Sequence, residues 1–267
     1  MKRGIAIADP HCGSLVGMTP PGWQVKRPSK STTKRSKWSV IQSETWDSYL
    51  YILKTYGPFD FGFSNGDMID GPGGRSGGTE QITTDREEQA DMAIEVHDQV
   101  RRYARKGFEW VGTFGTSYHT GEQEDWESII AERAGFKKIG SHEWISVNGC
   151  IFDMKHHCAS SSIPHGRFTA TAKERMWNVL WHERDLVPKA SVILRAHDHY
   201  FNYCGGAGWL AVAQPALQGM GSKFGARRCS GTVDWGVVIF DVADDGSFDW
   251  NAHIVQINSQ KAKMVKI

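Results

Sequence analysis

Short apolar segments that end in polar residues are the feature of this sequence that most limits its fold. The segments 4–9, 59–67, 108–116, 150–157 and 190–197 have the length and apolar content of buried strands. Several run into aspartate or histidine at the point where a strand would leave its sheet. Helical patterns between these segments, followed by a strand-rich stretch, predict an α/β core with a mixed sheet.

The helical patterns have recognisable ends. They cover residues 43–57, 83–107 and 167–186, and glycines at 57 and 107 are expected to end the first two. The later strands are expected at 208–216, 234–246 and 248–257. No repeat or linker divides the chain, so residues 1–267 are predicted to form one domain with long loops at 17–43 and 71–83.

Composition excludes several classes of partner. The net charge of +1 comes from 31 basic and 30 acidic residues, so no global field selects a polyanion. No stretch approaches the ~20 apolar residues of a membrane span, and we expect no membrane partner. The 5 cysteines are odd in number and form no CxxC pair, which is typical of reduced thiols in a cytoplasmic protein.

Two of the strand ends carry carboxylates with metal-ligand character. Asp9 and His11 follow the first segment, and residues two apart in extended chain point the same way, so they can share one ion. Asp67, in the motif GDMID, has two carboxylate oxygens and can bridge two cations. Asp70 in the same motif either orients a ligand or caps its loop.

Histidines occupy two further strand ends. His197 and His199 stand one residue apart after the segment 190–197, and His156 and His157 are adjacent after 150–157. Mixed oxygen and nitrogen donors suit Mn, Fe, Zn, Ni or Co better than Ca or Mg. Ligands bind at strand carboxyl ends in open α/β sheets, so these motifs predict one shared metal site.

In this order the motifs resemble those of the calcineurin-like metallophosphoesterases, with a match that runs from Asp9 to His199. The resemblance implies a four-layer αββα sandwich with two mixed β-sheets and two divalent metal ions at the strand ends, manganese being favoured. It implies one metal on Asp9, His11 and His199, a second on His156 and His197, and a bridge through Asp67. His156 is preferred because it shares a strand face with Phe152 and Met154, and His157 is the alternative.

One position departs from the family pattern. Where the family has a GNH motif this sequence reads FGTSYHTG, with Thr116 in place of asparagine and His119 three residues later. A neutral hydroxyl is a weaker ligand than an amide oxygen. Either Thr116 coordinates weakly, or His119 or water fills the position, and the occupancy of the second site depends on which holds.

The predicted activity is hydrolysis of a phosphate ester by water that the two metals activate, without a phospho-enzyme. His119 is the predicted general acid for the leaving oxygen, with Asp70 in support. A phosphodiester or nucleic acid is slightly favoured over a phosphomonoester. A non-catalytic metal-binding scaffold of the same fold is the alternative from another class, and Thr116 is its support.

Cations suggest how a phosphate substrate would be held. The segment 17–38 carries Lys26 and Arg27 among six basic residues and no acid, interleaved with tryptophans, a composition that suits DNA or RNA. The alternative is a solvated loop. His165 and Arg167, just after the histidine pair, are further candidate phosphate contacts.

Overall fold

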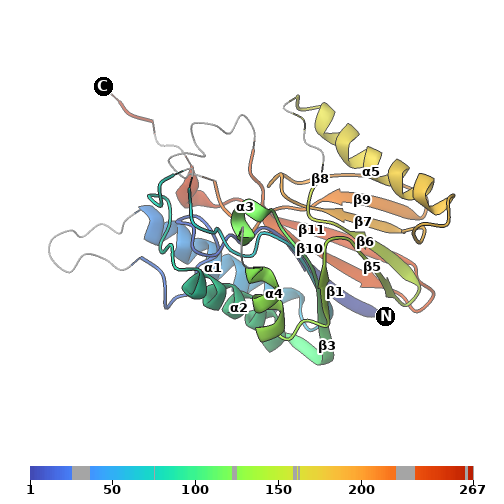
Figure 1. Cartoon of the computed structure of the whole chain (residues 1–267), viewed down its shortest axis with the longest axis horizontal. Coiled ribbons are helices and arrows are strands. Elements are labelled where there is room, and N and C mark those ends of the chain that lie inside the picture. Colours follow the sequence, from blue (N-terminus) through green and yellow to red (C-terminus); the bar gives the residue numbers. More distant parts are fainter. Residues whose placement is uncertain are drawn as a thin grey trace.

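The computed structural model describes residues 1–25, 37–74, 76–121, 125–158, 161, 163–220, 232–261 and 264–266. Two β-sheets pack face to face within this part of the chain, and helices cover the outer face of each sheet (Figure 1). The fold is a four-layer αββα sandwich with two mixed sheets. The predicted fold class is therefore confirmed.

The first sheet has six strands in the order β11-β10-β1-β2-β3-β4. The strands β1 to β4 run parallel, while β10 and β11 pair antiparallel at one side. Ile5 in β1 lies opposite Ile239 in β10 and Gly62 in β2. The bounds are β1 (Lys2–Ile7), β2 (Phe59–Asn65), β3 (Ala104–Thr113), β4 (Lys138–Gly140), β10 (Trp235–Val242) and β11 (Phe248–Val255).

The second sheet has five strands in the order β5-β6-β7-β9-β8. Its central strands β6, β7 and β9 are parallel, and antiparallel strands form both edges. Phe152 in β6 lies opposite Val192 in β7. The bounds are β5 (Glu143–Val147), β6 (Cys150–Met154), β7 (Val192–Arg195), β8 (Asn202–Gly206) and β9 (Trp209–Ala213).

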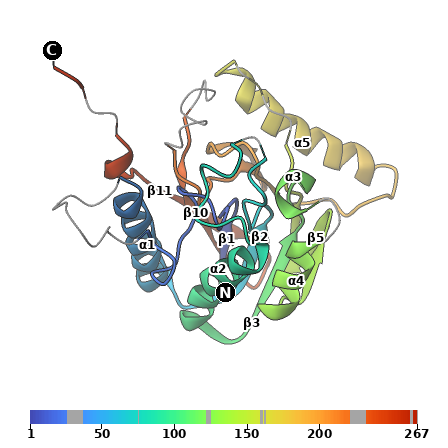
Figure 2. The ribbon, with the colours of Figure 1, turned by 60° about the vertical axis from the view of Figure 1, so that its left-hand side comes forward.

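Helices from two parts of the chain form the outer layers. Figure 2 shows α1, α2 and α4 together on one side of the molecule and α5 on the other. The first three pack on the six-stranded sheet, and α5 contacts β7, β8 and β9. The bounds are α1 (Lys37–Tyr56), α2 (Arg86–Arg102), α3 (Ser117–Thr120), α4 (Trp126–Arg133), α5 (Gly166–His182) and a 3-10 turn η1 (Asn258–Gln260).

Strand alternation divides the apolar residues between two cores. Along β1, Ile5 and Ile7 pack under the helices, whereas Ala6 faces the second sheet. Between the sheets the Phe152 ring lies 5.0 Å from Phe63 and 5.2 Å from the Phe240 ring, measured between centroids. These buried faces fix the strand register, and with it the positions of the strand ends.

Some predicted boundaries were wrong. The second helix ends at Arg102, because β3 begins at Ala104, and Gly107 lies inside that strand with a φ of 90° instead of ending the helix. Helix α1 begins at Lys37, inside the loop expected at 17–43. The short elements β4, β5, β8 and α4 were not predicted, because segments of three to eight residues with mixed polarity carry little periodic signal.

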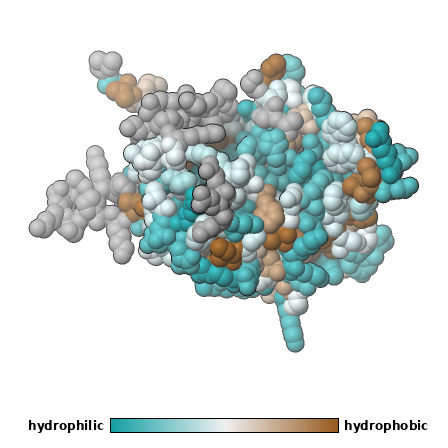
Figure 3. All heavy atoms as spheres, viewed as in Figure 1, coloured by the Kyte–Doolittle hydropathy of each residue, from teal (hydrophilic) through white to brown (hydrophobic). Residues whose placement is uncertain are grey.

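The molecular surface is mainly hydrophilic on the face shown in Figure 3, with hydrophobic side chains in separate spots. Some of the exposed apolar side chains belong to α5, among them Phe168, Met176 and Trp177. Within the described part of the chain, no helix combines the length and apolar content that crossing a bilayer requires.

Candidate metal centre

The predicted ligands follow five strands of the two sheets. Asp9 and His11 come after β1, Asp67 after β2 and Thr116 after β3 in the first sheet. The second sheet contributes residues after β6 and β7, and the loops from both sheets meet at one edge of the sandwich. The ligand candidates from the second sheet are His156, His197 and His199.

One group of three side chains joins the two sheets. The Nε2 atoms of His11 and His199 lie 3.1 Å apart, and Asp9 Oδ1 is 3.3 Å from the His199 nitrogen. His11 Nε2 is 3.9 Å from the same carboxylate oxygen. Asp9 and His11 are buried and His199 is partly buried, so three donor atoms face a common point away from bulk solvent.

A second group lies beside the first. His156 Nε2 is 3.1 Å from Asp67 Oδ2, and His197 Nδ1 is 3.9 Å from that oxygen. His11 Nε2, from the first group, lies 3.8 Å from it as well. Asp67 Oδ2 thus stands between the two groups, where a carboxylate that bridges two cations would be needed.

The adjacent histidines are separated by the fold. His156 is 3 % exposed and belongs to the second group, whereas His157 is exposed, with its ring 5.0 Å from that of His197. His156 Nδ1 donates to the carbonyl oxygen of Asn65 at 2.7 Å, so Nε2 is the nitrogen that faces Asp67. The structure therefore brings the preferred histidine, His156, into the group.

Strained backbone is concentrated at the candidate ligands. Of seven non-glycine residues with positive φ in the described chain, two, Asn148 and Asp185, lie in turns. The left-handed region costs of order 1–3 kcal/mol for such residues and persists where the surrounding structure enforces it. The other five are Asp9 (49°), His11 (42°), Asp67 (50°), His197 (76°) and His199 (56°).

Two glycines permit the close approach of these loops. A Cβ on Gly66 would lie 2.5 Å from His156 Nδ1, and a Cβ on Gly115 would lie 2.1 Å from Asp67 Oδ1. Either methyl group would displace a predicted ligand. The glycine that precedes Asp67 and the one that precedes Thr116 are therefore required by packing.

The donor set fits divalent cations. Asp9 Oδ1, His156 Nε2 and His197 Nδ1 are inaccessible to solvent and have no hydrogen-bond partner among the described residues. Leaving such polar atoms buried without a partner costs free energy. Carboxylate and imidazole donors in this arrangement suit the transition metals named above, and one cation in each of the two groups would satisfy all three atoms.

The pKa shifts of Asp67 and His156 indicate that positive charge is stabilised within the cluster. Burial raises the pKa of Asp67, but contact with His156 and His197 outweighs this and holds it well below its usual range. Burial lowers the pKa of His156, yet Asp67 and Asp9 raise it to about 10. A divalent cation supplies the same charge and displaces the imidazole proton.

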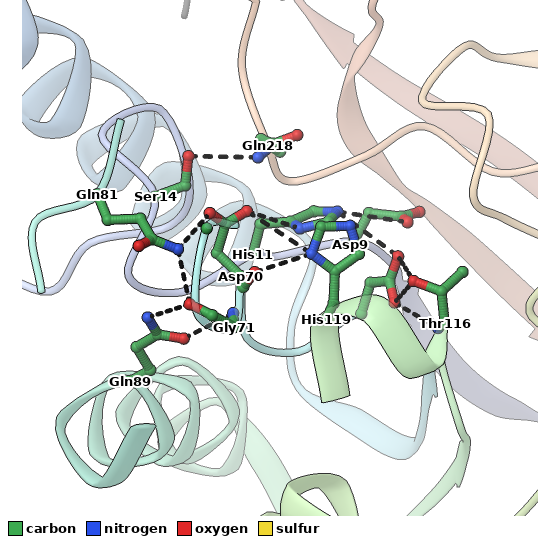
Figure 4. A network of polar contacts seen from close by, with 12 residues as sticks. Asp9, His11, Ser14, Asp70, Gly71, Gln81, Gln89, Thr116, His119 and Gln218 are labelled. Atoms are coloured by element: carbon green, nitrogen blue, oxygen red, sulfur yellow. Dashed lines mark hydrogen bonds and ion pairs between the residues drawn. The ribbon is translucent and has the colours of Figure 1, made fainter. Parts of the chain in front are cut away.

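Figure 4 shows Asp9, His11, Asp70 and His119 gathered in one region of the site. Asp70 Oδ1 lies 3.2 Å from His11 Nδ1, so Asp70 orients that imidazole. His119 Nδ1 donates to the Asp70 carbonyl oxygen at 2.9 Å. Burial and the charge of His11 lower the pKa of His119 to about 4. His11, Asp70 and His119 form a third set of donor atoms close enough to share a cation.

Thr116 is placed against the central carboxylate. Its backbone N–H donates to Asp67 Oδ1 at 2.6 Å, and its hydroxyl lies 3.1 Å and 3.3 Å from the two carboxylate oxygens. The hydroxyl is therefore a hydrogen-bond donor to Asp67 in this arrangement. Its use as a metal ligand stays a prediction.

Two glutamines hold the start of the predicted loop at 71–83 next to Asp70. Gln89, buried on α2, accepts from the Gly71 N–H at 2.8 Å and donates to the Gly71 carbonyl at 2.9 Å. Gln81 donates to Asp70 Oδ2 at 3.1 Å (Figure 4). These bonds position Asp70 and the residue that follows it.

The predicted substrate contacts are only partly placed. The Arg167 guanidinium lies 4.1 Å from the centre of the ring of Tyr200, the residue that follows His199 in the sequence. His165 is exposed immediately before α5. Lys26 and Arg27 lie outside the described residues.

Two buried residues at the site were missed from sequence. Glu127 on α4 accepts hydrogen bonds from the backbones of Met68 and Gly115, next to Asp67 and Thr116. Asn65 joins the sheets by donating to Gln214 at 2.7 Å. Neither residue stands in a recognisable motif, so no local pattern could have indicated them.

Comparison with family models and with curated proteins finds no match. Several solved structures are similar along most of the chain. A zinc complex of Vps29 from Entamoeba histolytica has 13% identity and a TM-score of 0.42, covering 94% of this chain and 98% of its own. An archaeal phosphodiesterase has 8% identity and a TM-score of 0.48, covering 94% and 99%. A Streptococcus pneumoniae protein described as a predicted phosphoesterase has 10% identity and a TM-score of 0.37, covering 94% and 98%. At identities this low, function depends on the residues of the site itself.

Proposed function

We propose that this protein is a metal-dependent phosphoesterase with a dinuclear centre. The observation that carries the proposal is the position of Asp67, whose Oδ2 lies 3.8 Å from His11 Nε2 in one donor group and 3.1 Å from His156 Nε2 in the other. A carboxylate shared by two histidine-containing groups is suited to two cations side by side. The mixed sheets, strained ligand backbones and unpartnered donor atoms support the same assignment.

The two metals would be held by different strand ends. When bound, they would clamp a phosphate, neutralise its charge and lower the pKa of a water molecule. Asp67 would contact both ions, and Thr116 would keep its carboxylate oriented. The first ion would be held by Asp9, His11 and His199, and the second by His156 and His197.

His119 is proposed to protonate the leaving oxygen. Its Nδ1 proton is held by the Asp70 carbonyl, so Nε2 is the nitrogen free to carry a transferable proton. With a pKa of about 4, His119 is neutral near pH 7. An anionic phosphate beside the ring would favour the charged imidazolium and raise that pKa, so the substrate itself would prepare the acid.

A phosphodiester, including DNA or RNA, is proposed as the substrate class. Arg167, whose guanidinium packs on the ring of the residue after His199, is proposed to neutralise a phosphate of this substrate. His165, Lys26 and Arg27 are proposed as further contacts along an extended polyanion. A phosphomonoester remains the second choice, because the metal groups would hold either phosphate.

A paired assay tests the proposal. The purified protein with added Mn²⁺ is given bis(p-nitrophenyl) phosphate or p-nitrophenyl phosphate, and release of p-nitrophenol is measured for each. We expect turnover of both that stops with EDTA, and faster turnover of the diester. Faster turnover of the monoester would reverse the choice of substrate. Mn²⁺ binding without turnover of either ester would favour the non-catalytic scaffold.

A further inference from the structure

Glu127 is a buried acid whose position the proposed chemistry does not require. It lies in the first turn of α4 and is 0% exposed. No lysine, arginine or histidine forms an ion pair with it in the described part of the chain. Burying a carboxylate is costly, and an apolar side chain would fill the same space more cheaply if packing were its only role.

Both carboxylate oxygens of Glu127 accept backbone hydrogen bonds from two different loops. Oε1 accepts from the Met68 N–H at 2.8 Å, and Oε2 accepts from the Gly115 N–H at 2.6 Å. Met68 directly follows Asp67 and Gly115 directly precedes Thr116. One rigid planar group therefore joins the loop after β2 to the loop after β3.

The same two loops meet again at Asp67. The Thr116 N–H donates to Asp67 Oδ1 at 2.6 Å, and Gly115 packs too closely against that carboxylate to accept a side chain. Glu127, Met68, Asp67, Thr116 and Gly115 thus form a closed ring of covalent and hydrogen bonds. Since the Asp67 backbone is strained, with a φ of 50°, its direction depends on contacts of this kind.

We infer that Glu127 is a positioning residue for the metal centre: it holds Asp67 and Thr116 in the arrangement that the second cation requires. The inference rests on the proposed function for the identity of the ligands. Beyond that function, the inference says that Glu127 on α4 sets the affinity of the group containing Asp67 and His156 for its cation. Glu127 itself touches neither cation nor substrate.

The test compares Glu127→Gln with Glu132→Gln, which changes an exposed acid on the same helix. Glutamine has nearly the same shape but one acceptor oxygen, so one of the two loop amides loses its partner. Calorimetric titration with Mn²⁺ gives the affinity of each binding event, and circular dichroism confirms folding at the same temperature. In Glu127→Gln we expect one event to weaken about tenfold to a hundredfold, the range for residues that orient ligands. The other event should weaken less, because Asp9, His11 and His199 also hold that ion, and the Glu132→Gln variant should stay close to wild type.

Amide hydrogen exchange in the wild-type protein gives a second readout that needs no metal. The Met68 and Gly115 amides should exchange slowly, and both loops should exchange faster in Glu127→Gln but not in Glu132→Gln. Rapid exchange of these two amides in wild type would overturn the inference even if no variant folded. So would a folded Glu127→Gln protein that binds Mn²⁺ with wild-type affinity in both events. A wild-type protein that binds no Mn²⁺ would instead overturn the proposed function, and the inference with it.

Discussion

Two buried charged clusters lie close together at the ends of β6 and β7, and they are built in opposite ways. In one, the fully buried Arg195 pairs with Asp153 and Glu174, with both N···O distances at 2.7 Å. In the other, Asp9 and Asp67 face four histidines, and several donor atoms have no hydrogen-bond partner among the described residues. The first cluster contains its own permanent cation, and the second does not.

The comparison distinguishes buried charges that pair with one another and stabilise the fold from buried charges that lack a partner and could bind a cation. Asp153 also accepts from Asn178 at 3.1 Å and contacts His142 at 2.8 Å, so its oxygens are fully used. In the candidate metal cluster, Asp9 Oδ1, His156 Nε2 and His197 Nδ1 have no hydrogen-bond partner among the described residues, and the backbones of Asp9 and His197 are strained. Asp9 Oδ1 can accept from a cation, and such a buried acceptor beside several imidazoles is suited to an external metal ion.

The largest effect is expected at the shared carboxylate. Asp67→Asn removes one negative oxygen from between the two groups, and the lost charge stabilisation of several kcal/mol should lower the rate by roughly 10³-fold or more. The measurement is Mn²⁺-dependent hydrolysis of bis(p-nitrophenyl) phosphate, with Asp249→Asn, an exposed acid on β11, as the matched control. A folded Asp67→Asn protein with wild-type turnover would contradict the claim that the cluster around Asp67 binds catalytic cations.

Breaking the self-contained cluster should damage stability instead. Arg195→Met leaves Asp153 buried without its guanidinium partner and Glu174 with only Lys155, which should lower the free energy of unfolding by about 3–5 kcal/mol. Urea unfolding measures the loss. Lys155→Met removes only a partly exposed partner of Glu174 at 3.3 Å and should cost about 1 kcal/mol or less. Equal losses in the two variants would contradict the account.

Added metal should stabilise only through the unsatisfied cluster. At a Mn²⁺ concentration a hundred times the Kd, binding raises the free energy of unfolding by about 2.7 kcal/mol. Wild-type protein should therefore unfold at higher urea concentration in Mn²⁺ than in EDTA, and Asp67→Asn should respond much less. If the two proteins gained equally, the metal would be bound elsewhere.

His97 is a buried titratable group that belongs to neither cluster, because it is neutral and its hydrogen bonds are satisfied by the protein. His97, fully buried on α2, bonds to Ser64 Oγ at 2.9 Å and to the Ala93 carbonyl at 2.7 Å, and burial lowers its pKa to about 4. The unfolded chain binds this proton near pH 6.5, so the stability that neutral His97 contributes is present above pH 6.5 and is lost as the pH falls toward 4.

Between pH 7 and pH 5 this loss should be about 2 kcal/mol. The measurement is urea unfolding of wild type and His97→Gln at both values, in EDTA so that metal binding does not contribute. The stability difference between the two proteins should shrink by that amount at the lower pH. A difference that does not change with pH would show that His97 is not held neutral.

The candidate ligands could be predicted from the sequence, whereas the residues that hold them in place could not. Asp9, His11, Asp67, His197 and His199 could be predicted because each follows an apolar strand at a short, fixed spacing, and strand carboxyl ends meet at one edge. The sequence did not indicate the partners that hold these residues. Glu127 and Asn65 act through contacts between elements far apart in the chain, and such contacts exist only after the sheets have packed.

Arg195 illustrates the same limit. It stands beside the histidine pair in the stretch RAHDHY, where its charge could equally serve a phosphate. Only the packed structure shows that its guanidinium is turned into the protein, toward Asp153 and Glu174. Local spacing predicts which residue types gather at a strand end, and the tertiary fold decides which of them face the ligand.

Anomalous diffraction from crystals soaked in Mn²⁺ tests the central claim most directly, because it shows where a cation sits without reference to activity. The account predicts two peaks on either side of Asp67, one among Asp9, His11 and His199 and the other beside His156 and His197. Well-ordered side chains at these positions with no peak next to Asp67, at saturating Mn²⁺, would contradict it.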